Sequence, residues 1–107
     1  MKKDHLIIKN MNNWKSNIIN LGSLKPNSTV YVKFESNIPL DIARVEPECL
    51  ACTKFIDYKD NILTLSLKVS DPKHLSYTHL PLSKSATVYY NDGTSDTLKF
   101  VGVIKKQ

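Results

Sequence analysis

The feature that most constrains this chain is a strict alternation of apolar and polar residues over residues 63–69. Leucine or valine occupies every second position from Leu63 to Val69, and polar residues fill the positions between them. Because successive side chains of a β-strand point to opposite faces, this spacing predicts a strand with one buried face. Helical periodicity is almost absent from the chain, so we expect an all-β fold.

Shorter runs rich in β-branched and aromatic residues recur along the chain, bounded by Asn, Asp, Gly, Pro and Ser. They predict strands over residues 5–9, 18–19, 29–35, 40–45, 54–58, 62–69, 86–90 and 96–104. Six to eight short strands in about a hundred residues is the strand count of an immunoglobulin-like domain. We therefore expect residues 1–107 to form a single immunoglobulin-like β-sandwich of about seven antiparallel strands.

Turn signals separate these strands. Residues 21–28 are typical of a turn in which Pro26 presets the backbone of the first central position. Asp92-Gly93 predicts a hairpin with a type I′ turn, in which both central residues have positive φ. Residues 70–84 contain two prolines and no alternation. We expect a long irregular connection there, which either crosses between sheets or carries a contact surface.

Length and composition exclude several classes of protein. The 107 residues suffice for one domain with one core, and 41% hydrophobic and 23% charged residues are ordinary for a globular protein. No apolar run approaches the roughly 20 residues of a membrane-spanning helix. The apolar run at residues 6–8 is too short for a signal peptide. We therefore expect no membrane association and no secretion through a signal peptide, with the chain in the cytoplasm or in a virion assembled there.

The net charge of +5 raises the question of nucleic-acid binding, because lysines that neutralise phosphates give sequence-independent affinity. The chain has fourteen lysines and a single arginine, Arg44, and most of the lysines stand alone in the sequence. Base readout favours the planar fork of arginine, so we expect no specific nucleic acid. We interpret the lysines as solvated surface and strand-edge protection, and we keep lysine-mediated nucleic-acid binding as an alternative.

Cys49 and Cys52 form a Cys-x-x-Cys motif, whose spacing lets two thiolates bind one metal ion or close a small disulfide ring. In a reducing cytoplasm the simplest expectation is two thiols that pack as small hydrophobic side chains at a strand end. A tetrahedral site would need His74 and His79 as further ligands, at a spacing longer than zinc fingers use. We predict no metal and no cofactor, and we keep a small metal-binding or redox domain as an alternative.

No catalytic constellation is present, because the glycines are isolated and the aspartates lie in or beside turns, where aspartate caps backbone groups. Trp14, the single tryptophan, is expected to cap the core. Tyrosine is enriched at protein interfaces, and one of two adjacent strand tyrosines must point outward. The candidate partner contacts are Tyr77, His79, Tyr89 and Tyr90.

Several short landmarks follow one another in a recognisable order: Leu21-Gly22, Lys25-Pro26, residues 30–34, Asn37, Pro39-Leu40, Ile42, Val45, Cys49, Cys52-Thr53 and residues 98–104. This order resembles the Hydin-like family of immunoglobulin folds, also called ASH domains, which is related to the major sperm protein fold. The resemblance covers residues 14–104. The chain departs from it by placing two residues between the cysteines, where bacterial members more often have one. It also has residues 80–83 in place of a Pro-Gly turn.

The resemblance implies a non-enzymatic module that docks on larger protein assemblies, and it offers no catalytic residues. The chain is rich in Lys, Asn and Ile, which indicates an AT-rich coding genome. From these features we predict a small structural protein of a tailed-phage virion that decorates the capsid or tail. Its partner is then a capsid or tail protein, and the host assembly sets its oligomeric state.

Overall fold

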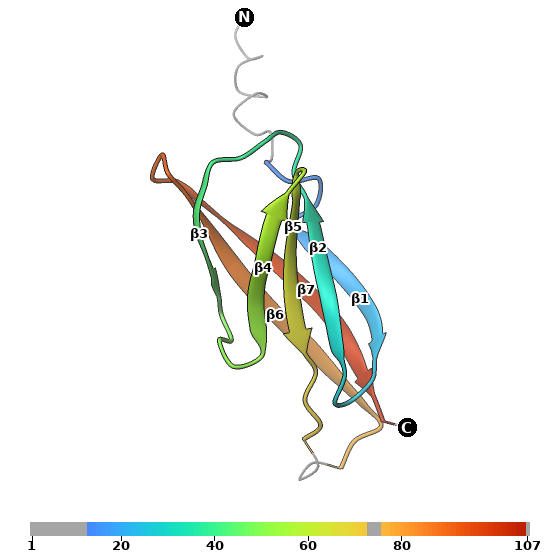
Figure 1. Cartoon of the computed structure of the whole chain (residues 1–107). Helices are drawn as coiled ribbons and strands as arrows, with labels where there is room; N and C mark the ends of the chain where they lie inside the picture. The colour runs from blue at the N-terminus through green and yellow to red at the C-terminus, as the bar shows by residue number, and fades with distance from the viewer. Residues whose placement is uncertain (1–12, 73–75, 107) are drawn as a thin grey trace, which may run out of the picture.

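The computed structural model describes residues 13–72 and 76–106, and within them the chain forms seven strands in two layers (Figure 1). The predicted fold class, an all-β sandwich, is confirmed, whereas the strand predicted at residues 5–9 lies outside the described residues. The strands are β1 (Ile18–Leu24), β2 (Thr29–Glu35), β3 (Ile42–Pro47), β4 (Thr53–Lys59), β5 (Ile62–Lys68), β6 (His79–Tyr90) and β7 (Ser95–Lys105).

The four-stranded sheet has the order β1-β7-β6-β3, and the three-stranded sheet has the order β2-β5-β4. All pairs are antiparallel except β1 with β7, which run parallel, so the expectation of antiparallel strands throughout is wrong at this pair. The reason lies in the connection that follows β1. The chain turns at Pro26-Asn27 and crosses to the other sheet, so no hairpin fixes the direction of β1 against its neighbour.

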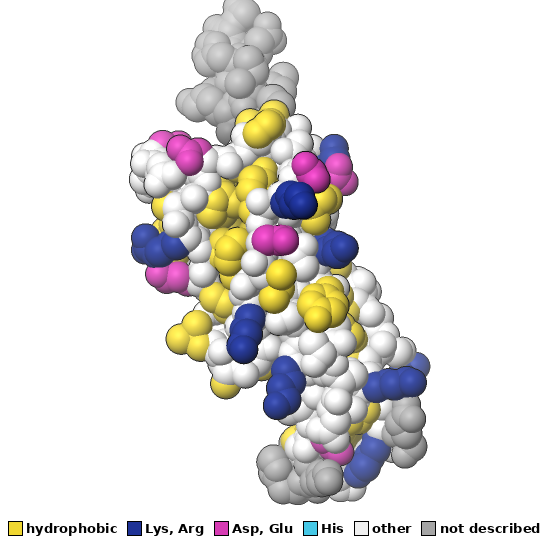
Figure 2. All heavy atoms as spheres, viewed as in Figure 1, with side chains coloured by type: hydrophobic (Ala, Val, Ile, Leu, Met, Phe, Trp, Pro, Cys, Tyr) yellow, Lys and Arg dark blue, Asp and Glu magenta, His cyan; other side chains and the backbone are white. Residues whose placement is uncertain are grey.

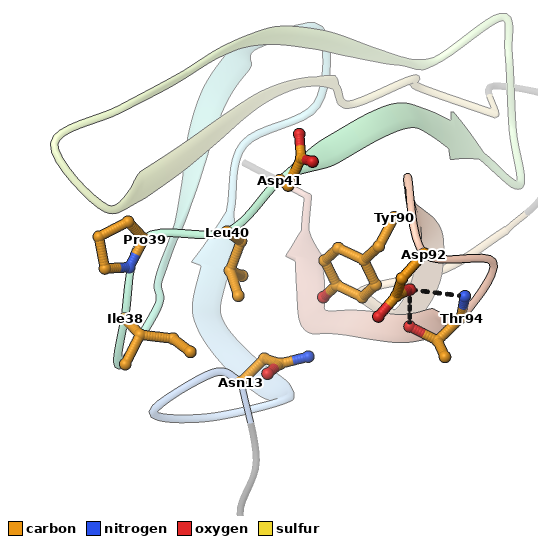
Figure 3. Close-up of a pocket in the computed structure, with 8 residues that line it drawn as sticks. All are labelled: Asn13, Ile38, Pro39, Leu40, Asp41, Tyr90, Asp92 and Thr94. Carbon is orange, nitrogen blue, oxygen red and sulfur yellow. Dashed lines mark hydrogen bonds between the residues drawn. The ribbon is translucent and has the colours of Figure 1, made fainter.

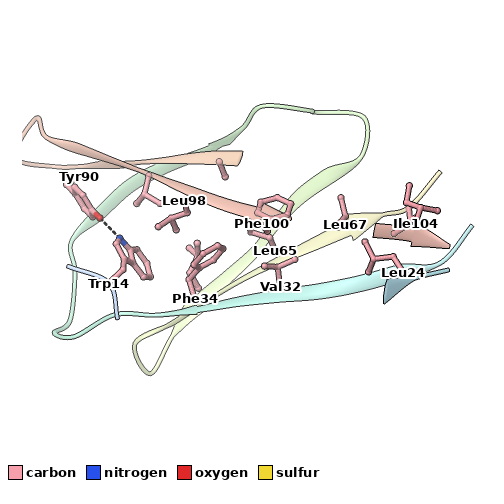
Figure 4. Packing of buried hydrophobic residues seen from close by; sticks show 14 residues of the cluster. Trp14, Leu24, Val32, Phe34, Leu65, Leu67, Tyr90, Leu98, Phe100 and Ile104 are labelled. Atoms are coloured by element: carbon pink, nitrogen blue, oxygen red, sulfur yellow. Dashed lines mark hydrogen bonds between the residues drawn. The ribbon is translucent and has the colours of Figure 1, made fainter. Parts of the chain in front are cut away.

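The core lies between the two sheets (Figure 4). Its buried hydrophobic side chains are Trp14, Leu24, Val32, Phe34, Leu63, Leu65, Leu67, Val69, Ala86, Val88, Tyr90, Leu98, Phe100 and Ile104. The Phe34 ring packs edge-to-face on Trp14 and on Phe100, with 6.4 Å between ring centres in both pairs. Trp14 is 1% exposed, which confirms that it caps the core.

Two predicted boundaries are wrong because strand pairing extends further than the residue pattern indicates. β1 continues through residues 21–24, which we expected to be turn, because Leu24 pairs with Ile104 of β7. β6 begins at His79, so the irregular connection is shorter than residues 70–84. Pro81 is tolerated there because β6 pairs with β3 only from Ala86 onward, which leaves one side of the strand free.

The predicted type I′ turn at Asp92-Gly93 is also wrong. Gly93 has a φ of 91°, but Asp92 does not have positive φ. The Asp92 carboxylate instead accepts hydrogen bonds from the Thr94 backbone N–H at 2.9 Å and from its hydroxyl at 2.6 Å, within a four-residue loop. The two-residue turn with positive φ at both positions is Asp60-Asn61, between β4 and β5, at 53° and 66°.

Candidate interaction surface

One lateral side of the sandwich is open. β3 and β4 are edge strands of different sheets, and each has a hydrogen-bonded neighbour on one side only. They do not pair with each other, and a groove of about 540 Å³ lies between them. Figure 1 shows β3 diverging from the sheet that carries β4, and Figure 2 shows hydrophobic side chains in the hollow between them. We call this hollow the β3/β4 groove.

Side chains of β4 face the groove from the three-stranded sheet. Phe55 lies opposite Leu65 in the strand register, and Tyr58 lies opposite Leu63, so both point to the inner side of the sheet. Leu63 and Leu65 are 0% exposed, whereas Phe55 is 43% exposed. The inner face is therefore sealed along β5 and uncovered along β4.

β3 lines the opposite wall. Ile42 and Val45 lie opposite Tyr90 and Val88, two buried residues of β6, and so they also point inward. Both remain half-buried, and both line the groove. The groove thus exposes side chains whose orientation is that of core residues.

Both walls carry a register irregularity that limits regular pairing along the free edges. On β4 the register shifts between Phe55 and Asp57, and the intervening Ile56 is 48% exposed beside Phe55. On β3 the shift lies between Ile42 and Arg44. Bulges of this kind protect edge strands from indiscriminate pairing with other chains.

The Tyr58 hydroxyl fixes the upper end of the groove. It hydrogen-bonds the Ser36 hydroxyl at 2.8 Å and accepts from the Leu40 backbone N–H at 3.1 Å. The Tyr58 ring also packs edge-to-face on Trp14, with 6.2 Å between ring centres. These contacts hold the segment before β3 against β4, so the groove wall is preformed there.

A smaller hollow of about 230 Å³ continues beyond this end and shares Leu40 and Asp41 with the groove (Figure 3). Tyr90 lines it, but it is only 8% exposed, so the prediction of Tyr90 as a surface contact is wrong. Its hydroxyl accepts from Trp14 Nε1 and donates to Asp96 Oδ2, each at 2.8 Å. Burial, together with the hydrogen bond to Asp96, raises the pKa of Tyr90 to about 12.

The other predicted contact residues do not converge on one surface. Tyr89 points outward and is half-buried, and the Arg44 guanidinium lies 3.9 Å from its ring centre. Tyr77 donates to Asp71 Oδ1 at 3.0 Å, and His79 is exposed. His79 and Tyr89 occupy opposite ends of β6, which places them about 33 Å apart at the usual strand rise.

The expectation of two free thiols is wrong, because Cys49 and Cys52 form a disulfide. The backbone of the turn between β3 and β4 explains why: Thr53 N–H donates to the Cys49 carbonyl at 3.0 Å, and the two cysteine Cα atoms lie 5.6 Å apart. Both side chains are half-buried rather than in the core. As a disulfide the pair does not ligate a metal, and His74 lies outside the described residues.

Sequence reasoning missed the groove residues, although one signal was available. The run from Lys54 to Tyr58 has adjacent apolar residues, Phe55 and Ile56, which breaks the alternation that a regular strand would show.

Within residues 13–72 and 76–106 no group of three or more His, Cys, Asp or Glu side chains is placed to hold a metal ion. No helix in this part of the chain has the length and apolar character needed to cross a bilayer.

The chain matches no protein-family model and no curated protein sequence. Among solved structures it is similar to an endo-fucoidan hydrolase from glycoside hydrolase family 107, with 13% identity and a TM-score of 0.60. The match covers 88% of this chain and 13% of the hydrolase, so the chain corresponds to a small part of that enzyme. A variant of the same hydrolase gives a TM-score of 0.61 at 12% identity.

The chain is also similar to the titin M3 domain, with 9% identity and a TM-score of 0.54, over 86% of this chain and 94% of that domain. At these identities the similarity establishes the fold and no activity. The immunoglobulin-like sandwich is therefore a property that this chain shares both with a part of a large hydrolase and with a titin domain.

Proposed function

We propose that this protein is a non-enzymatic interaction module that docks on a larger protein assembly through the β3/β4 groove. The observation that carries the proposal is the row of inward-pointing apolar side chains, Ile42, Val45 and Phe55, left uncovered between two unpaired strand edges. A hollow with apolar walls, lined also by Asp41 and Arg44 and bordered by free backbone groups, fits an extended peptide segment. Such a segment would hydrogen-bond to a strand edge and place alternate side chains in the hollow.

The energetics favour Phe55 as the anchor of this contact. Full burial of a side chain of this size contributes about 1.5–3 kcal/mol, and 43% of Phe55 is still exposed to solvent. The hydrogen bonds of Tyr58 already hold the segment before β3 in place, so little conformational entropy of the groove is lost on binding. We therefore expect Phe55 to contribute the largest single share of the binding free energy.

For the assembly itself we propose a tailed-phage virion, in which the chain decorates the capsid or tail. The support is the small size of the domain and its composition rich in Lys, Asn and Ile. The resemblance to Hydin-like domains adds the precedent of docking on large assemblies. Mass spectrometry of purified particles from the source that encodes this chain tests this step, and particles that lack the chain would refute it.

The groove is tested on the same particles by site-specific photo-crosslinking. A photoreactive phenylalanine analogue at position 55 is expected to crosslink to one particle protein. The same analogue at position 18 is the matched control, because Ile18 is 58% exposed on β1, at the edge of the other sheet, where it pairs with Lys99. Phe55→Ser should reduce incorporation into particles at least tenfold. Equal crosslinking from both positions, or full incorporation of Phe55→Ser, would contradict docking through the groove.

A further inference from the structure

The outer face of the β2-β5-β4 sheet gathers lysines that are far apart in the sequence. Lys33 of β2, Lys54 of β4 and Lys68 of β5 are all exposed, and each alternates with a buried neighbour such as Val32, so each points away from the core. Figure 2 views this side of the molecule, with lysine side chains in dark blue across it. We call the three lysines together with Tyr31 the lysine face.

Tyr31 lies on β2, the edge strand of the sheet that is farthest from β4. It pairs with Ser66, which in turn pairs with Lys54, so Tyr31 and Lys54 are two strand spacings or about 10 Å apart. Lys33 lies two residues further along β2, at about 7 Å. The Tyr31 side chain is 63% exposed, and no hydrogen bond or ring contact engages it within the described part of the chain.

A hollow of about 280 Å³ lies on the same face, beside the Cys49–Cys52 turn. Lys54 and Lys68 flank it, and Thr29 and Ser66 add two hydroxyl groups. Two ammonium groups with neighbouring hydroxyls are donors suited to phosphate oxygens. The hollow is thus of the size and chemistry to accept a phosphate group between the two lysines.

The three lysines of this face form no ion pair within the described residues, although Lys33 lies beside Glu35 on β2 and across β5 from Asp57. The one ion pair among residues 13–72 and 76–106 joins Arg44 to Glu46, on the other sheet. Carboxylates on the same face as Tyr31 occur toward the end with the Asp60-Asn61 turn, where Glu35 pairs with Ile62 and Asp57 pairs with Thr64. The half that contains Lys54, Lys68 and the hollow carries no carboxylate in a strand.

We propose that the lysine face binds single-stranded nucleic acid, with phosphates at Lys33, Lys54 and Lys68 and a base stacked on Tyr31. An exposed aromatic ring on a sheet face can stack a base only when that base is unpaired, which favours a single strand over a duplex. Lysines act as point charges without a fixed hydrogen-bonding fork, so the binding is independent of sequence. This site lies on the outer face of the β2-β5-β4 sheet and is separate from the β3/β4 groove.

The test measures fluorescence anisotropy of a labelled 15-nucleotide oligothymidylate with the full chain at several salt concentrations. Three phosphate contacts predict a slope of about −2 in log K against log salt, because each contact on a single strand contributes about −0.7. Lys54→Gln with Lys68→Gln should leave a slope of about −0.7. The matched control is Lys99→Gln with Lys105→Gln, which removes the same charge from the outer face of the other sheet and should keep the slope near −2.

The stacking contact has its own readout. Tyr31→Ala should weaken oligothymidylate binding at least fivefold, whereas Tyr31→Phe should bind as the unchanged chain does. Trp14 fluorescence, from a buried side chain, reports that each variant is folded. Equal loss from both lysine double variants, no effect of Tyr31→Ala, or equally tight binding of a duplex or of heparin would each overturn the proposal. Those last two outcomes would assign the face to polyanions in general.

Discussion

β4 and β5 are hydrogen-bonded neighbours of equal length in one sheet, and both direct apolar side chains inward, yet only β5 is sealed. The leucines of β5 are 0% exposed because β6 and β7 of the opposite sheet lie over them. Phe55 of β4 has the same orientation but is 43% exposed, because a groove separates β3 from β4 and leaves this side chain uncovered. The same inward pattern therefore stabilises the fold in one strand and presents a surface in the next.

The largest expected loss of stability comes from a substitution in the sealed strand, β5. Leu65→Ala should lower the free energy of unfolding by about 2–5 kcal/mol, because it leaves a cavity in a fully buried site. Urea unfolding followed by Trp14 fluorescence measures the change in midpoint. A loss under 1 kcal/mol would mean that β5 is packed no better than the groove.

The second prediction concerns the disulfide at the start of β4. Replacing both Cys49 and Cys52 by serine should cost about 2 kcal/mol, because the covalent ring closes only four residues of the unfolded chain. The same loss should follow when a reductant is added to the unchanged protein. If reductant destabilises the serine variant equally, the effect does not come from this disulfide.

The third prediction concerns the end of the sandwich that Trp14 closes. Tyr90→Phe should cost about 1–2 kcal/mol near neutral pH, because Trp14 Nε1 and the Asp96 carboxylate lose their shared partner. Because the folded-state pKa of Tyr90 is raised to about 12 from 10, its contribution is complete below pH 10. It is lost as the pH rises from about 10 to about 12. Over this pH range the free energy of unfolding should fall less steeply for Tyr90→Phe than for the unchanged protein. The same pH dependence in both proteins would contradict a raised pKa for Tyr90.

The smallest expected change in stability is at the groove itself. Phe55→Ser should lower the free energy of unfolding by about 1 kcal/mol, because 43% of the side chain is already exposed and its removal leaves no sealed cavity. Urea unfolding measures this beside Leu65→Ala. A loss as large as that of Leu65→Ala would show that Phe55 belongs to the core in solution and that the groove is closed.

The residue pattern predicted much of the fold, and its failures have a common physical origin. Alternation predicted β2 over residues 29–35 with correct bounds, because a half-buried strand shows its two faces in its own side chains. It failed at Leu24 and at Pro81, since those residues are strand only through a partner that lies far away in the sequence. The parallel pairing of β1 likewise depends on its distant partner β7 and cannot be predicted from the residues of β1 alone.

The candidate surfaces were hidden for the same reason. Periodicity indicates which way Phe55 points, but the exposure of Phe55 depends on where β3 runs. The lysines look scattered because each strand contributes only one or two of them, and the register then places three of them on the same face as Tyr31. Orientation was predictable from the sequence, whereas coverage by another element was not.

The parallel pairing of β1 with β7 has a consequence for the order in which the protein forms. β1 acquires its sheet neighbour only from residues 99–104, so the strand must wait through synthesis of almost the whole chain. Contacts between such distant segments carry a large loop-closure cost, and proteins dominated by them fold in milliseconds to seconds. We expect the nascent chain to remain incompletely folded until β7 has left the ribosome. Truncation within β7 would leave β1 without a sheet neighbour and β6 paired with β3 alone.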